Sequence, residues 1–178
     1  MKRRLIVVVG VTGVVCSTVL LAQAPVPHAA DLLIGMWKQN MEKSTYNPGP
    51  PPPRGSGSVR QYAAGDDGAI VAITININPQ GLPSLGAISA ANYDGKEYAQ
   101  HTLATLATSL GSHIGPRIDR TISYTPTDRY TVEIVQKQDG QVVSKSTRTI
   151  SRDGKTLTER ITSTQGQLVT NVVVFEKQ

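Results

Sequence analysis

The sequence predicts an all-β domain, an antiparallel up-and-down meander of about eight strands that closes into a barrel. Two observations carry this prediction. Hydrophobic and polar residues alternate with period two in several short runs, and Asp-Gly pairs lie between those runs. The alternation is typical of half-buried strands, and Asp-Gly favours tight hairpin turns because such turns need positive φ. Closure removes the exposed strand edges of a meander, and a two-sheet sandwich is the alternative.

The clearest strand is predicted between residues 69 and 77, where Val71, Ile73, Ile75 and Ile77 share one face. Similar runs rich in Val, Ile, Thr and Tyr follow; they span 118–124, 130–134 and 172–175. These residue types fit a pleated surface. From residue 127 onward the runs recur about every ten residues, which favours a meander over βαβ units.

Two segments interrupt this pattern. The polyproline stretch 47–53 cannot continue a helix or a central strand, so we expect a crossing between a first strand and the rest; a docking motif is the alternative. In 100–115, four apolar residues recur at helical spacing and predict a helix of about ten residues, with a loop as the alternative. They are Leu103, Leu106, Ala107 and Leu110.

The amino-terminal 24 residues are typical of a secretory signal peptide. Lys2, Arg3 and Arg4 precede a stretch, residues 5–22, that contains no charge. Ala22-Gln23-Ala24 fits the small-residue cleavage pattern, but Pro25 follows directly and should hinder cutting after Ala24, so cleavage after Ala22 or as late as Ala30 stays open. An uncleaved anchor is the alternative. We therefore expect a secreted or periplasmic protein with a single domain over 31–178.

Charge and cysteine content narrow the function classes. Without the three basic residues of the signal, 18 − 3 = 15 basic residues face 13 acidic ones, so the mature domain is nearly neutral and gives no electrostatic argument for nucleic acid. The arginines form no run, and we expect solvated strand faces for them, Arg60, Arg120 and Arg148 included. Cys16 lies in the signal, so the domain has no disulfide.

Five short motifs resemble those of a known group. They are Gly35 to Asn40, Lys43-Ser44, Pro48-Gly49-Pro50, Tyr93 to Tyr98 and Ser151 to Thr158. In this order they resemble small secreted lipocalin-like proteins of soil bacteria without known function. The opening Gly35-Met36-Trp37 is similar to the first strand of calycin barrels, and Val172 to Lys177 to the last strand of fatty-acid-binding proteins.

The resemblance implies a calycin-like barrel that holds a small apolar or amphipathic ligand. In fatty-acid-binding proteins an Arg and a Tyr on the last strand hold the ligand carboxylate. The matching positions here are Val173 and Phe175, which cannot donate a hydrogen bond to an anion. A clamp of that kind is therefore not expected. Trp37 is expected in the core at the closed end of the barrel.

Residues that could carry chemistry are few. His101 and His113 lie in the irregular stretch with no cysteine beside them, and no nucleophile-elbow motif or phosphate-binding glycine loop occurs. We therefore expect no cofactor, no metal and no enzymatic activity. If the barrel is hollow, inward tyrosines can orient a ligand through their hydroxyl groups; the candidates are Tyr62, Tyr93, Tyr124 and Tyr130. Tyrosines at the sheet surface are the alternative.

The sequence thus favours a monomeric protein that binds a small hydrophobic ligand, with no nucleic-acid partner and with membrane contact only through an uncleaved signal. The alternative is a structural or interaction module of the cell envelope. That module would have a filled core and an exposed apolar patch, with the polyproline stretch and residues 103–110 as its candidate surfaces.

Overall fold

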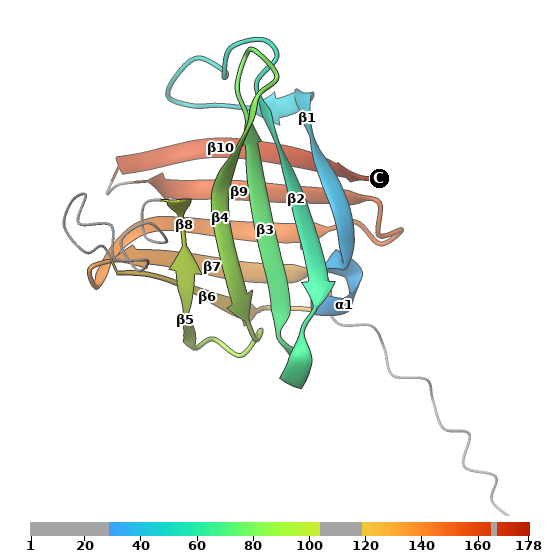
Figure 1. Cartoon of the computed structure of the whole chain (residues 1–178), viewed down its shortest axis with the longest axis vertical. Coiled ribbons are helices and arrows are strands. Elements are labelled where there is room, and N and C mark those ends of the chain that lie inside the picture. Colours follow the sequence, from blue (N-terminus) through green and yellow to red (C-terminus); the bar gives the residue numbers. More distant parts are fainter. Residues whose placement is uncertain (1–28, 104–118, 165–166) are drawn as a thin grey trace, which may run out of the picture.

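The computed structural model describes residues 29–103, 119–164 and 167–178. The predicted signal peptide and most of the predicted helix near residues 103–110 lie outside this part. A short helix and ten strands make up the described chain (Figure 1). They are α1 (Ala29–Leu33), β1 (Gly35–Thr45), β2 (Gly57–Ala64), β3 (Ile70–Ile77), β4 (Pro83–Ala91), β5 (Glu97–His101), β6 (Arg120–Pro126), β7 (Thr131–Gln138), β8 (Gln141–Ile150), β9 (Thr156–Thr164) and β10 (Gln167–Lys177), with one 3-10 turn, η1 (Asp66–Gly68).

The strands form one closed antiparallel barrel. Each strand pairs with the next along the chain, and β1 pairs with β10 to close the circle. The predicted meander and its closure are confirmed, but the barrel has ten strands and not about eight. The alternation of hydrophobic and polar residues does not predict β2 and β4, because their inward positions are polar or small, as with Arg60 and Ser89. In Figure 1, β2 to β5 run across the direction of β6 to β10 behind them.

The Asp-Gly pairs lie between successive strands, as predicted. They join β2 to β3, β4 to β5, β7 to β8 and β8 to β9. The glycine of each pair has positive φ, between 69° and 79°. In the β7–β8 hairpin Asp139 also has positive φ, 49°, which is the backbone of a two-residue hairpin turn. The polyproline segment is the crossing between β1 and β2, also as predicted.

One end of the barrel is closed by α1 and by Trp37. The Trp37 side chain is fully buried, and its indole N–H donates a hydrogen bond of 2.7 Å to the Leu33 carbonyl. The Lys177 ammonium lies 5.2 Å from the centre of the ring. Ala29, two residues before the predicted domain boundary, is also fully buried and belongs to a core cluster that includes Ala91. Trp37 is therefore a core residue, as the sequence predicted.

The interior changes character along the barrel. Near α1 it is apolar, with a core cluster that includes Leu33, Ile70, Leu157 and Phe175. Farther from α1 the inward positions become polar, because successive inward residues of β8 run from Ile150 through Arg148 and Ser146 to Ser144. The polar half of the interior is where a functional site can form.

Strand β3 shows this change most clearly. The predicted strand at residues 69–77 is confirmed, but its more polar face points inward. Ala72, Thr74 and Asn76 line the interior, so Val71, Ile73, Ile75 and Ile77 lie outside by the alternation of a strand.

The neighbouring strand β4 is bulged at Gly86. A Cβ there would lie 2.9 Å from the Asn76 amide nitrogen and 3.1 Å from the Thr74 carbonyl oxygen. Glycine therefore allows the two strands to approach along the wall of the interior. Within the described residues, no helix is both long enough and apolar enough to cross a membrane.

Candidate functional site: a buried arginine–glutamate cluster

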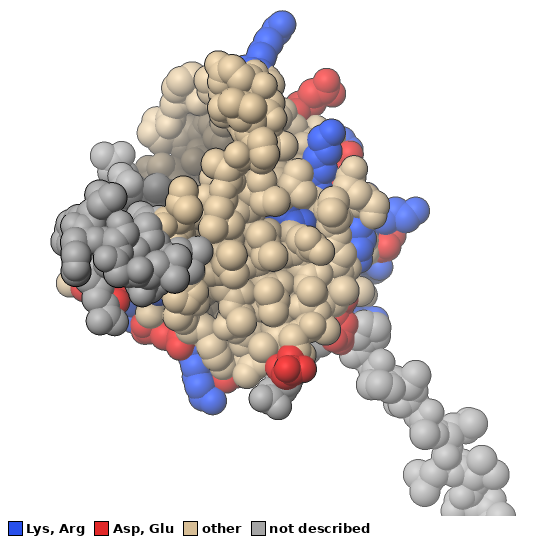
Figure 2. Space-filling model, in the orientation of Figure 1, with Lys and Arg blue, Asp and Glu red and all other residues tan. Residues whose placement is uncertain are grey.

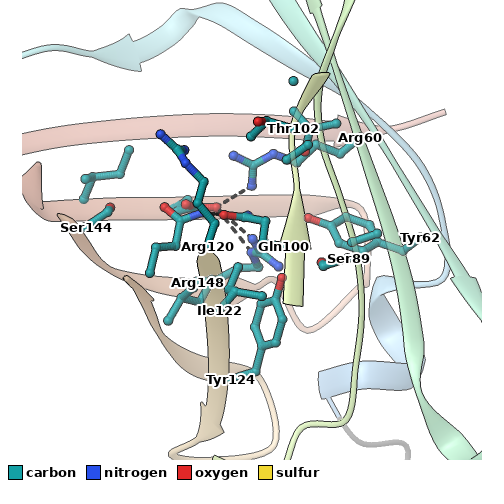
Figure 3. A pocket seen from close by; sticks show the side chains of 18 of the residues that line it. Arg60, Tyr62, Ser89, Gln100, Thr102, Arg120, Ile122, Tyr124, Ser144 and Arg148 are labelled. Atoms are coloured by element: carbon teal, nitrogen blue, oxygen red, sulfur yellow. Dashed lines mark hydrogen bonds and ion pairs between the residues drawn. The ribbon is translucent and has the colours of Figure 1, made fainter. Parts of the chain in front are cut away.

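A cavity of about 290 Å³ occupies the polar half of the barrel (Figure 3). Strands β2 to β9 supply its walls. Polar side chains line most of the cavity, with isoleucines between them. The lining includes Arg60, Tyr62, Ser89, Gln100, Arg120, Ile122, Tyr124, Ile134, Gln136, Arg148, Glu159 and Ile161. The barrel is thus hollow in this half, and its lining is more polar than a purely apolar ligand would require.

A glutamate held by two arginines forms the centre of the lining. Glu159 Oε2 accepts hydrogen bonds from Arg60 and from Arg148 Nη2, the latter at 3.1 Å. Glu159 Oε1 accepts a hydrogen bond of 3.2 Å from the Ser146 hydroxyl. Arg148 is 5% exposed and Glu159 is 8% exposed. Figure 3 shows Arg60 and Arg148 pointing toward one another from different walls, with Tyr62 and Tyr124 beside them.

Strand alternation places these three charges inside. Arg60 shares the inward face of β2 with Tyr62, and Arg148 shares that of β8 with Ile150. Glu159 lies between Leu157 and Ile161 on the inward face of β9. The expectation that Arg60 and Arg148 lie on solvated faces is therefore wrong. One sequence pattern does indicate a buried charge: Glu159 lies between Leu157 and Ile161 on the same face of the strand.

Aromatic rings cover the arginines. The Arg60 guanidinium lies 4.3 Å from the centre of the Phe175 ring, and that of Arg148 lies 5.4 Å from Tyr62 and 5.7 Å from Tyr124. These distances are within the range of cation–π attraction. On the last strand, Val173 and Phe175 pack in the core. The positive charge comes from β2 and β8 instead.

The cluster keeps its carboxylate ionised. Burial alone would raise the pKa of Glu159, but the nearby positive charges of Arg60 and Arg148 outweigh it and lower the pKa to about 2. The same carboxylate raises the pKa of both arginines against the opposing effect of burial. All three groups are therefore charged over the whole physiological pH range.

Acid should weaken the fold through this carboxylate. Because the folded pKa of Glu159 lies below its ordinary value of 4.5, its contribution to stability is complete above about pH 5 and is lost as the pH falls toward 2. Lowering the pKa of Glu159 from 4.5 to about 2 corresponds to a contribution on the order of 3 kcal/mol to the free energy of unfolding, which is lost in acid. Urea unfolding at pH 7, 5 and 3.5 measures it. A Glu159→Gln variant should lack this part of the pH dependence, and an unchanged slope in that variant would contradict the assignment.

Three of the four predicted tyrosines converge on the cluster. Tyr62 and Tyr124 are each 3% exposed and line the cavity. Tyr93 stacks on Tyr124 with ring centres 4.6 Å apart and planes 7° apart. Burial raises the pKa of Tyr93 and of Tyr124, so both hydroxyl groups stay protonated and can donate hydrogen bonds. Tyr130, half-buried beneath the Arg129 guanidinium, does not line the cavity.

Two features leave the cavity short of negative charge. Among its described lining residues, Arg60, Arg120 and Arg148 are positive and Glu159 alone is negative. In addition, Arg60 Nε of the lining is buried and forms no hydrogen bond in the described part, although buried polar groups in proteins are normally paired. Arg148 Nη1 and the Tyr93 hydroxyl also lack a partner of good hydrogen-bond geometry, but the two side chains are close enough for Arg148 to lower the pKa of Tyr93 against the larger effect of burial.

Other predicted candidates lie apart from this site. His101 is exposed at the end of β5, and His113 lies outside the described residues. No group of three or more potential metal ligands occurs in the described ranges.

Comparisons with protein-family models, with curated proteins and with solved structures found no match for this chain. The architecture is compatible with a calycin-like fold, because it is a closed antiparallel barrel with a hollow interior.

Proposed function

We propose that this protein is an exported, non-enzymatic barrel that binds a small amphipathic ligand through an anionic group. The observation that supports the proposal is the excess of positive charge around the cavity, where three arginines and one carboxylate are found among the described lining residues. A carboxylate or a similar anion would balance this excess and accept hydrogen bonds from the arginines. Such charge-assisted hydrogen bonds are about twice as strong as neutral ones.

The remaining lining suits the rest of an amphipathic molecule. Ile122, Ile134 and Ile161 give apolar contacts between the polar groups. The amide side chains of Gln100 and Gln136 are joined by a hydrogen bond of 3.2 Å and offer further polar contacts. At about 290 Å³ the cavity is near the lower limit of typical ligand pockets, so the ligand is small.

Calorimetric titration with three eight-carbon probes tests this proposal: octanoate, octanamide and octylammonium. We expect octanoate to bind at least tenfold more tightly than octanamide, and octylammonium not to bind. An Arg148→Met variant should lose at least tenfold in octanoate affinity, because it removes a buried donor while Arg60 still pairs with Glu159.

Arg129→Met is the matched control, since Arg129 is exposed and lies outside the cavity. It should bind octanoate as the wild type does. Circular dichroism verifies that both variants are folded. Equal affinity for octanoate and octanamide, or unchanged binding in folded Arg148→Met, would refute the anionic part of the proposal. Native mass spectrometry of protein incubated with lipid extract tests ligand binding as such, and a protein that never carries a ligand would refute the whole.

A further inference from the structure

A continuous apolar surface covers the outside of three neighbouring strands. Arg60, Thr74 and Ser89 point into the cavity from β2, β3 and β4, as do the other lining residues of these strands. Because side chains alternate along a strand, the residues between the lining residues point outward. We call these outward residues the outer apolar face; it consists of Val59, Ala63, Val71, Ile73, Ile75, Ile77, Leu85, Ile88 and Ala90, with Gln61 as its polar member.

Strand pairing brings these side chains into contact across the face. Ile75 lies between its partners Val59 on β2 and Leu85 on β4, and Ile73 is paired with Ile88. Ile75 is 36% exposed. Directly opposite residues on one face of a sheet are close enough to touch, so the row is continuous and not a set of isolated side chains.

The outer apolar face differs from the rest of the barrel in its charge. No residue on it is charged. The other strands carry exposed charges outside, as with Lys38 on β1, Glu133 on β7 and Arg160 on β9, and Lys137 of β7 pairs with Glu97 of β5. In Figure 2 the surface over β3 and β4 is almost entirely tan, and most blue and red atoms lie around its margins.

We propose that the outer apolar face is the interface of a homodimer, in which β2 to β4 of two copies pack face to face. A twofold dimer brings the same patch of both subunits together. Such a patch must be complementary to itself, and a face without charge meets this condition because no like charges are brought together. Two sheets pack in this way about 10 Å apart, with side chains interdigitating.

The size of the face fits a weak dimer. Three strands spaced about 4.8 Å apart, each about eight residues long at about 3.3 Å per residue, give a footprint of roughly 14 Å by 26 Å. Two facing copies cover on the order of 750 Å² by this footprint alone, which is below the roughly 1,000 Å² of a specific stable interface and typical of a weak one.

This proposal replaces the expectation of a monomer and is independent of ligand binding, because the outer apolar face and the cavity lie on opposite sides of the same strands. Of the surfaces that the sequence predicts for a partner, Leu103 is 62% exposed and residues 104–110 lie outside the described part of the chain. The outer apolar face on β2 to β4 is a further surface, which the sequence did not predict.

Sedimentation equilibrium of the purified protein from 5 to 500 µM tests the proposal. We expect the wild type to be a dimer at the upper concentrations, and Ile75→Lys and Leu85→Lys each to weaken dimerisation at least tenfold, because each places a charge in the centre of the interface. Val135→Lys is the matched control, since Val135 points outward from β7, away from the outer apolar face.

Circular dichroism verifies that the lysine variants fold, and Ile75→Thr, which keeps the β-branched shape, replaces Ile75→Lys if the latter does not. A wild type that stays monomeric at 500 µM would overturn the proposal, as would folded variants that dimerise like the wild type. A monomer that sediments with phosphatidylcholine vesicles would overturn it in favour of a membrane contact.

Discussion

Replacing Glu159 by glutamine is expected to lower the free energy of unfolding by about 3–5 kcal/mol, because removal of one partner from a buried ion pair leaves the other charge uncompensated. Here the loss affects two guanidinium groups. Arg60 and Arg148 both donate to Glu159 Oε2, and Arg148 is only 5% exposed. Neither has another acidic side chain among the described residues that line the cavity.

The measurement is urea unfolding at pH 7, with Arg160→Gln as the matched control. Arg160 is the next residue along β9 and is exposed on the outside, so its removal should change stability by less than about 0.5 kcal/mol. If Glu159→Gln were as stable as the control, the arginines would have to be neutralised by another group.

The same variant connects stability with the proposed function. Without Glu159 the cavity keeps three arginines and no carboxylate among its described lining residues. An added anion should then restore part of the lost stability, because a ligand that binds only the folded state stabilises it by mass action. We expect octanoate to raise the unfolding midpoint of Glu159→Gln more than that of the wild type, and octanamide to raise neither.

Replacing Trp37 by alanine is the second change with a large expected effect, a loss of about 3–5 kcal/mol. The side chain is fully buried at the closed end of the barrel and packs in the cluster with Leu33 and Phe175. Alanine would leave a cavity there and would also leave the Leu33 carbonyl without its 2.7 Å hydrogen bond from the indole.

Met36→Ala controls for this change, since Met36 is the preceding residue and is 47% exposed. Its removal should cost less than about 1 kcal/mol. Thermal unfolding followed by far-ultraviolet circular dichroism measures both variants. A Trp37→Ala protein as stable as Met36→Ala would contradict the role of Trp37 in closing the barrel.

The fold could be predicted from the sequence where strands have apolar side chains inside and polar side chains outside. The carboxyl-terminal strands β6 to β10 and their Asp-Gly turns follow it, because their inward positions near α1 are apolar, as with Val132 and Leu157. The inward positions of β2, β3 and β4 are polar or small, as with Arg60 and Thr74. Alternation alone therefore identified β3 as a strand but could not say which face is buried.

The candidate site was predicted only in part for the same reason. Aromatic residues on strands suggest a lining, and Tyr62 and Tyr124 do line the cavity. The sequence does not predict buried arginines, because a single charge in a strand is usually solvated and only pairing across the barrel makes its burial acceptable. That pairing joins Arg60 to Glu159, which are 99 residues apart, and no local pattern shows it.

The burial of Ala29 bears on how an export signal could be removed. The side chain is fully buried beside Ala91 and Ile122, and α1 begins at this residue. A signal peptidase cut after Ala30 would divide α1 and separate Ala29 from the core that it helps to fill. A cut after Ala22 or Ala24 would leave the whole helix on the mature chain, so the end of the folded domain favours the earlier cleavage positions.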